Sequence, residues 1–354
     1  MSKKINLFAI LVLALMVMFT VSCEGPAGEP GVAGAEGPVG PEGPAAQVTC
    51  LSCHNDATML DNQFEMARSQ HGSGDLAVDY AGGRGSCAPC HGHEQFVEYV
   101  TTGDVNGNYA TPTPWQCSTC HGLHTTFEET FEEDTDYALR LTSAVTAMFD
   151  ATVTMDVDAS SNLCVNCHQA RRGFDSMVST DGLTGTLTSS HAGPHHGPQA
   201  NLLLGNNGSM AGTAFSPHLE AGCVGCHMYE TTGDEINING GHTFWPAAEK
   251  CNDCHTGPDV VFDASRDGEF EHEGYYDYKG FQTDIAAKLH DLAGLLVTEG
   301  ILDSAHHTVP GTYGIDVYKA WWNYIYIAED RSHGVHNPYW TESLLDEGIT
   351  ALTP

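Results

Sequence analysis

The pattern Cys-x-x-Cys-His occurs six times in this chain of 354 residues, and it constrains the fold more than any other feature. Two cysteines three positions apart lie on one turn of backbone, where each thiol forms a thioether with a vinyl group of one haem. The residue that follows places an imidazole against the iron. The pattern therefore predicts six covalently attached haem c groups.

The expected haem attachment residues follow directly from the six copies. The thioether cysteines are Cys50, Cys53, Cys87, Cys90, Cys117, Cys120, Cys164, Cys167, Cys223, Cys226, Cys251 and Cys254. The proximal iron ligands are His54, His91, His121, His168, His227 and His255.

Zinc sites and redox-active thiol pairs also use two cysteines at this spacing. Neither requires a histidine directly after the second cysteine. Histidine accounts for only 20 of the 354 residues, so six histidines in six equivalent positions are not expected by chance. Of the 13 cysteines, Cys23 alone lies outside the motifs, which leaves no pair for a disulfide.

Residues 1–22 have the features of a secretory signal peptide: two lysines, an apolar run and a small residue, Ser22, before the only spare cysteine. This segment resembles a bacterial lipoprotein signal, in which the cysteine at this place is acylated and becomes the new N-terminus. The resemblance implies lipidation of Cys23 and a membrane tether that does not cross the bilayer. Cleavage nearby, leaving a free thiol, is the alternative.

Residues 23–46 contain glycine at every third position from Gly25 to Gly43, with prolines between. This is the collagen period, in which only glycine fits at the axis of three wound chains. Seven triplets are few, so we favour an extended spacer, although the segment is also a possible site of oligomerisation.

The formal net charge of −33 argues against nucleic-acid binding, which needs a basic surface. It suits basic partners or metal cations. The densest acidic run, residues 128–136, is a candidate docking site for a basic redox partner, and a solvated loop is the more ordinary interpretation.

Residues 47–354 are expected to form one haem-organised multihaem cytochrome domain, mainly α with long loops and a few short strands. The intervals between motifs are irregular, which excludes a solenoid of equal repeats. We expect a helix over 57–71 that delivers His71, short strands within 137–157, and loop over 180–217.

The C-terminal third is predicted to contain three helices. Apolar spacing indicates a helix over 284–299 capped by Thr283, and a second over 316–329 with an aromatic stripe that packs against its neighbours. Asn337 as cap and Pro338 at the first helical position predict the third.

The fourteen histidines outside the motifs are more than a surface role explains, and distal iron ligands account for part of this surplus. The candidates are His71, His124, His218, His242, His336 and, from the cluster His191, His195 and His196, His196. The further candidates are His93, His290, His306, His307 and His333.

The run Asp330 to Pro338 (DRSHGVHNP), followed by Leu344-Leu345, resembles the C-terminal segment of bacterial multihaem cytochromes, including relatives of the pentahaem nitrite reductases and the octahaem enzymes. In that pattern the histidine before Asn-Pro is a distal ligand, which implies this role for His336. Residues 162–169 and 190–198 are similar to segments of the same group. The resemblance implies a mostly helical, low-potential electron-transfer protein.

Three functions fit these features. Two histidines on every iron leave no position for a substrate, which gives a carrier that passes electrons to other cytochromes, redox proteins or an extracellular acceptor. One five-coordinate haem would instead give a reductase of a nitrogen or sulfur oxyanion. Subunits sharing ligands would form a filament. We favour the carrier, exported as an outer-membrane or cell-surface lipoprotein, with a periplasm-facing location as second choice.

Overall fold

The structure is a computed structural model that describes residues 56–122, 138–210, 215–230, 239–246, 248–256 and 278–353. The chain divides into two units, Met1–Val48 and Thr49–Pro354, and the described residues all belong to the second. Several predicted features lie outside the described residues. They are the signal peptide with Cys23, the glycine-rich spacer, the first motif Cys50–His54, His124 and the acidic run at 128–136.

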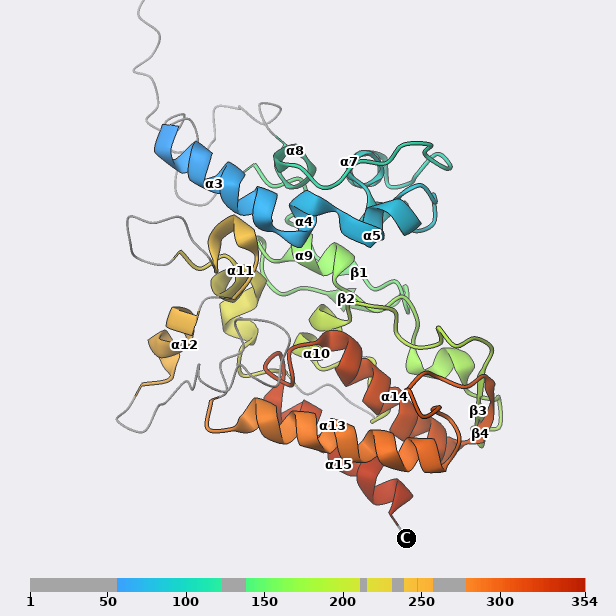
Figure 1. The fold of residues 1–354 in the computed structure, drawn as a ribbon. Coiled ribbons are helices and arrows are strands. Elements are labelled where there is room, and N and C mark those ends of the chain that lie inside the picture. The colour runs from blue at the N-terminus through green and yellow to red at the C-terminus, as the bar shows by residue number, and fades with distance from the viewer. Residues whose placement is uncertain are drawn as a thin grey trace, which may run out of the picture. The chain divides into compact units, whose positions relative to one another are not determined.

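Helices dominate the described residues, and most are short (Figure 1). The α-helices are α3 (Asp56–Arg68), α4 (Gln70–Ser73), α5 (Asp75–Ala77), α6 (Ala88–His91), α7 (His93–Thr102), α8 (Cys117–Cys120), α9 (Asn162–Cys167), α10 (Gln199–Leu204), α11 (Gly222–His227), α12 (Ala248–Cys254), α13 (Phe281–Thr298), α14 (Ile315–Asp330) and α15 (Pro338–Leu352). A π-helical turn covers Val78–Gly82, and 3₁₀ turns cover Phe174–Met177, Leu219–Ala221 and Gly241–Thr243.

The strands are two antiparallel pairs. They are β1 (Val145–Thr146) with β2 (Thr154–Met155), and β3 (Thr184–Leu187) with β4 (Gly311–Gly314). This content confirms the predicted mainly α fold with a few short strands. None of the helices in the described ranges is long and apolar enough to cross a membrane.

The largest apolar core lies among α13, α14 and α15, where α14 packs against both of the others (Figure 1). The stripe Tyr318, Trp321 and Trp322 is fully buried there. Leu344 and Leu345 of α15 are equally buried, as their spacing predicts for the inner face of a helix. All three C-terminal helices predicted from the sequence are confirmed, and the aromatic stripe serves helix packing.

The caps of these helices agree with prediction in one case and differ in another. Asn337 caps α15: its side chain accepts a hydrogen bond from Trp340 N and donates one to Leu202 O at 3.0 Å. The predicted cap Thr283 is wrong, because α13 begins earlier, at Phe281, and is preceded by Gly280 with φ of 81°. The left-handed backbone of this glycine turns the chain into α13, and Gly280 offers no side-chain cap.

The predicted loop over 180–217 is wrong in two places, since it contains β3 and α10. Strand β3 was missed because its partner β4 is distant in sequence and its TGTL segment has little apolar alternation. Gly185 of β3 lies so close to the Tyr318 ring that a Cβ atom would clash at 2.2 Å. Helix α10 is too short to show a helical period, although all three of its leucines are buried.

The helix predicted over 57–71 is confirmed with a break. Helix α3 ends at Arg68, and Ser69 starts α4 by accepting a hydrogen bond from Gly72 N through its hydroxyl at 3.0 Å. His71 therefore projects from a separate turn. The short strands expected within 137–157 are also confirmed, with Val145 paired to Met155.

Candidate functional site

The five motifs among the described residues share one local structure, a short helical turn. In the copies at 117, 164 and 251, the backbone N–H of the motif histidine donates to the carbonyl of the first cysteine at 2.8–2.9 Å. This hydrogen bond closes the turn, so both thiols lie on one side of it with the imidazole directly after them. Such a turn suits thioether attachment at two points.

Each of these five motif histidines faces a second histidine from elsewhere in the chain. The distances between ring centroids are 6.0 Å for His91–His195, 6.3 Å for His121–His242, 6.1 Å for His168–His71, 6.2 Å for His227–His336 and 6.1 Å for His255–His218. Two imidazoles on opposite sides of one metal ion have centroids about 6 Å apart, because each metal–nitrogen bond is about 2 Å. The donor set and its spacing therefore fit a haem iron with two axial histidines.

Four of the predicted distal histidines are among these partners: His71, His218, His242 and His336. In the cluster at 191–196, the histidine that faces a motif histidine is not the one that we predicted. The structure brings His195, rather than His196, to His91. His195 has a φ of 83°, which turns it toward the motif, whereas the ring of His196 is 70% exposed and hydrogen-bonds to Glu329.

Paired variants of these two neighbours should separate their roles. We expect His195→Ala to convert one low-spin iron signal to high spin, because the partner of His91 is lost, and His196→Ala to leave the signals unchanged. Electron paramagnetic resonance of the oxidised proteins measures the difference. The opposite pattern would restore His196 as the partner, and equal effects would show that the site tolerates exchange between the two imidazoles.

The Nδ1 atoms of these histidines have specific partners within the chain. His168 bonds to Gln199 Oε1 at 3.2 Å, and His336 bonds to Asp330 Oδ1 at 2.7 Å. His227 donates to the carbonyl of Phe244 at 2.8 Å and His218 to that of Val335 at 2.6 Å. A partner on Nδ1 leaves Nε2 for a metal and fixes the direction of the ring.

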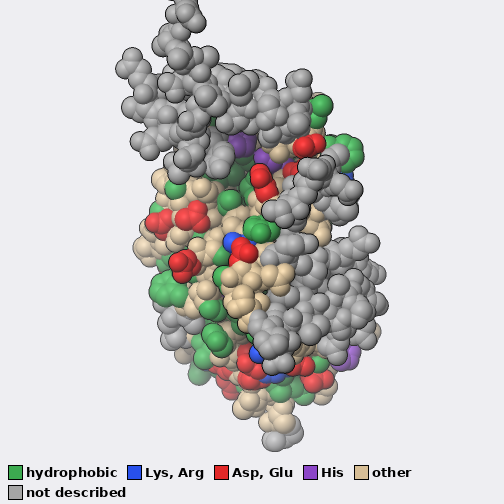
Figure 2. All heavy atoms as spheres, turned by 90° about the vertical axis from the view of Figure 1, so that its left-hand side faces the viewer, with side chains coloured by type: hydrophobic (Ala, Val, Ile, Leu, Met, Phe, Trp, Pro, Cys, Tyr) green, Lys and Arg blue, Asp and Glu red, His purple; other side chains and the backbone are tan. Residues whose placement is uncertain are grey.

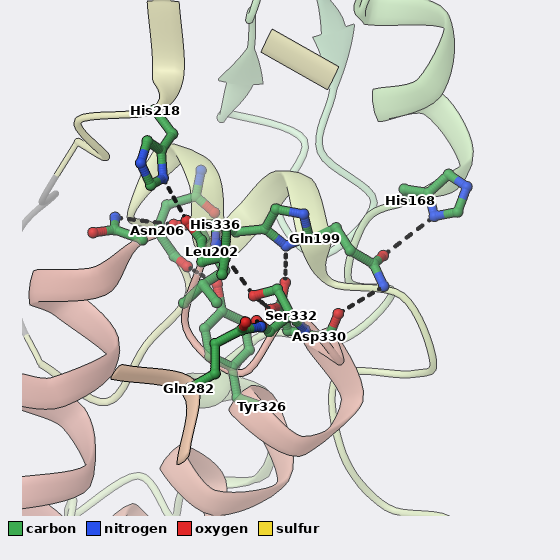
Figure 3. A network of polar contacts seen from close by, with 12 residues as sticks. His168, Gln199, Leu202, Asn206, His218, Gln282, Tyr326, Asp330, Ser332 and His336 are labelled. Atoms are coloured by element: carbon green, nitrogen blue, oxygen red, sulfur yellow. Dashed lines mark hydrogen bonds and ion pairs between the residues drawn. The ribbon is translucent and has the colours of Figure 1, made fainter. Parts of the chain in front are cut away.

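Figure 3 shows that two of these sites are joined by one polar network. Gln199 accepts from His168 and donates through Nε2 to Asp330 O at 3.2 Å. The Asp330 carboxylate accepts from both Ser332 and His336, and it is itself 1% exposed. The Nδ1 partners of His168 and His336 therefore meet at Asp330, one through its backbone carbonyl and the other through its carboxylate.

Burial keeps most of these imidazoles neutral, which is the form that binds a metal. It lowers the pKa of His71, His195 and His227 to about 4, assisted by neighbouring positive groups. At His336 burial also disfavours the charged ring, but the Asp330 carboxylate outweighs it and raises the net pKa. The Asp330 carboxylate on Nδ1 thus makes His336 a more basic ligand.

The motif turns also touch one another. Cys90 Sγ lies 3.6 Å from Asn166 O, and Cys167 Sγ lies 3.9 Å from Pro89 O, so α6 and α9 meet at their cysteines. The Ser161 hydroxyl accepts from Cys223 N at 2.9 Å, which brings α11 to the start of α9. The motif at 164 consequently has a neighbouring motif on each side.

Acidic side chains are common on the described surface of the protein. On the face drawn in Figure 2, Asp and Glu side chains recur while Lys and Arg are sparse. Lys288 on α13 is paired with Glu342 and Asp346 at 3.0 and 2.7 Å. A partner that docks here by charge must carry basic residues.

The sequence and the fold of this chain are similar to those of known cytochromes. Residues 44–134 match the cytochrome c3 family. The fold is similar to the crystal structure of the outer cell wall cytochrome OcwA, with 18% identity, a TM-score of 0.53, and coverage of 82% of this chain and 50% of that one. It is also similar to an undecahaem cytochrome from the S-layer of Carboxydothermus ferrireducens, with 19% identity, a TM-score of 0.46, and coverage of 79% and 40%. No curated protein matches.

The chain thus has the fold of a multihaem cytochrome and carries a cytochrome c3-like segment, which together imply covalently bound haem c and support electron transfer. It spans about half the length of the outer cell wall cytochrome that it matches.

Proposed function

We propose that this protein is an exported, membrane-tethered hexahaem c-type cytochrome that relays electrons between redox partners, each iron being held by two histidines. The five imidazole pairs with centroids 6.0–6.3 Å apart carry this proposal. A pair of axial histidines fills both faces of an iron, which suits outer-sphere transfer of electrons and leaves no place for a substrate.

Haem c supplies a one-electron Fe(III)/Fe(II) couple when bound. The residues of this chain attach it, ligate it and set its surroundings. Motif cysteines bind the macrocycle, and the histidine pairs bind the iron. Asp330, Gln199 and the Phe244 and Val335 carbonyls orient ligands through Nδ1. Contacts between α6, α9 and α11 bring three attachment sites together, which favours rapid transfer among them.

The sixth attachment, at Cys50, Cys53 and His54, is proposed from the sequence motif alone, and His124 is a candidate for its distal histidine. The same holds for acylation of Cys23 and for location on the outer membrane or cell surface.

Cys23→Ala should move the protein from the membrane fraction to the soluble fraction, and an unchanged distribution would contradict the anchor. The net charge of −33 supports a basic redox partner.

The decisive test is haem content and spin state of the purified protein. After expression in a host that matures c-type cytochromes, we expect six haems per chain, retained in acid acetone, and oxidised spectra with low-spin iron only. A lower haem content would correct the number of sites. A high-spin signal would indicate an open axial position and support the oxyanion reductase, and particles that grow with concentration would support the filament.

A further inference from the structure

Phe244 contacts histidines that belong to three different pairs. Its ring meets the His71 ring edge to face, with centroids 4.6 Å apart and planes at 87°. The same ring meets His242 at 6.0 Å and 74°. Its backbone carbonyl accepts the Nδ1 hydrogen bond of His227 at 2.8 Å. Each of these histidines faces a motif histidine or is one, so a single residue touches three candidate iron sites.

The backbone that presents Phe244 is held firmly. Phe244 has a φ of 60°, in the left-handed region that side-chain-bearing residues rarely adopt. The turn closes through Gly240 N donating to Trp245 O at 2.6 Å, and the Thr243 hydroxyl donating to Gly240 O. Glu65 on α3 accepts from His242 N at 2.8 Å. Since such strain persists only where surrounding contacts impose it, the position points to a functional constraint.

These contacts affect the orientation, the tautomer and the basicity of imidazoles that are candidate iron ligands. An edge-to-face neighbour fixes the plane in which an imidazole lies, and a carbonyl on Nδ1 fixes its tautomer and increases its basicity. The Phe244 ring contacts both His71 and His242, so it covers part of each imidazole. Burial, hydrogen bonding and ligand orientation are the means by which a protein tunes haem potentials.

We propose that Phe244 is a positioning residue that sets the ligand geometry, and thereby the redox potentials, of three haem sites at once: His168–His71 and His121–His242 through its ring, and His227–His336 through its carbonyl. This inference rests on the proposed haem ligation. It goes beyond that proposal because it assigns the side chain and the carbonyl of Phe244 a role in tuning three haem sites.

Four variants test it. Phe244→Leu removes the ring, and Phe244→Tyr retains it. Phe244→Gly removes the ring but keeps the carbonyl and suits a positive φ. Phe174→Leu is the matched control, because Phe174 packs against Tyr318 and Trp322 in the apolar core. The measurements are haem content, low-spin signals in electron paramagnetic resonance, and midpoint potentials, with signals assigned by His71→Ala, His242→Ala and His336→Ala.

With the haem content unchanged, we expect Phe244→Leu to alter the signals of the His71 and His242 sites. Their ferrous-to-ferric ratio at fixed applied potential should fall about threefold or more, because water that reaches the rings stabilises the ferric charge. Phe244→Tyr, which retains the aromatic ring, should give the same signals as the wild-type protein. Phe244→Gly should alter the same two sites and spare the His227 site. Phe174→Leu should lower thermal stability without altering any signal.

Unaltered signals in Phe244→Leu at full haem content would overturn the inference, as would equal changes at every site. Failure of the underlying function would look different: wild-type protein would then lack the expected haem content or its low-spin signals, whatever stands at residue 244.

Discussion

Replacing His71 by alanine should convert one low-spin iron to high spin and lower the stability of the protein. His71 faces His168 at 6.1 Å and lies against Trp115 and Phe244 at 5.4 and 4.6 Å. Its loss opens one axial position and leaves a cavity between two large rings. By analogy with other large-to-small interior substitutions, we expect the free energy of unfolding to fall by about 2–5 kcal/mol. Electron paramagnetic resonance and thermal unfolding measure the two effects.

His290→Ala is the matched control, because His290 is exposed on α13 and its ring neighbour is His306 rather than a motif histidine. It should leave spectra and stability unchanged. His71→Met provides a second comparison, since a thioether keeps the iron six-coordinate and raises its potential. If His71→Ala kept every low-spin signal, His71 would not be a ligand, and the assignment of the His168 site would fail.

Asp330→Asn should raise the midpoint potential of the His227–His336 site. The buried Asp330 carboxylate accepts from His336 Nδ1 at 2.7 Å, which stabilises the ferric state by its charge and by making the ligand more basic. Removing that charge destabilises the ferric state relative to the ferrous state by about 1–2 kcal/mol at an effective dielectric constant near 20. This corresponds to roughly 40–90 mV, given 59 mV per tenfold change for one electron.

Asparagine keeps one oxygen that accepts from His336 Nδ1, while its amide nitrogen replaces the oxygen that accepts from Ser332. Asp346→Asn serves as control, because Asp346 is an exposed residue of α15 that pairs with Lys288 at 2.7 Å. Potentiometric titration followed in the visible spectrum gives the midpoint potentials. A potential that stays constant or falls in Asp330→Asn would show that the carboxylate does not act on the iron through His336.

The helices with strong local signals were predictable from sequence. Asn337 and Pro338 start α15 as expected, because a cap and a helical first turn are local properties. The stripe Tyr318, Trp321 and Trp322 likewise marks a buried helix face. Strand β3 was not predictable, since its pairing with β4 depends on residues far away in the chain. Gly280 initiates α13 by its left-handed backbone, which no side-chain pattern reports.

The candidate site also contains some residues that were predictable from the sequence and others that were not. Attachment residues follow from a five-residue motif, and the structure gives their common turn. Partners of the motif histidines depend on long-range folding: His242 comes to His121 and His336 to His227 from distant segments. His195 and His196 are adjacent and chemically identical, so only the backbone at His195 decides which one faces His91. The roles of Gln199 and Phe244 had no sequence signal, because both act through ligands placed by the fold.

Helices α13 to α15 hold the largest apolar core and contain no attachment motif, yet they and the segment between α14 and α15 supply Asp330 and His336. Because the chain is synthesised from its N-terminus, His227 is made well before His336. Under the proposed ligation, an iron held at His227 before the C-terminal helices pack would meet other imidazoles, and a misplaced one would form a kinetic trap. Exchangeable axial bonds would then let a misplaced histidine leave, while thioethers would hold each cofactor in place.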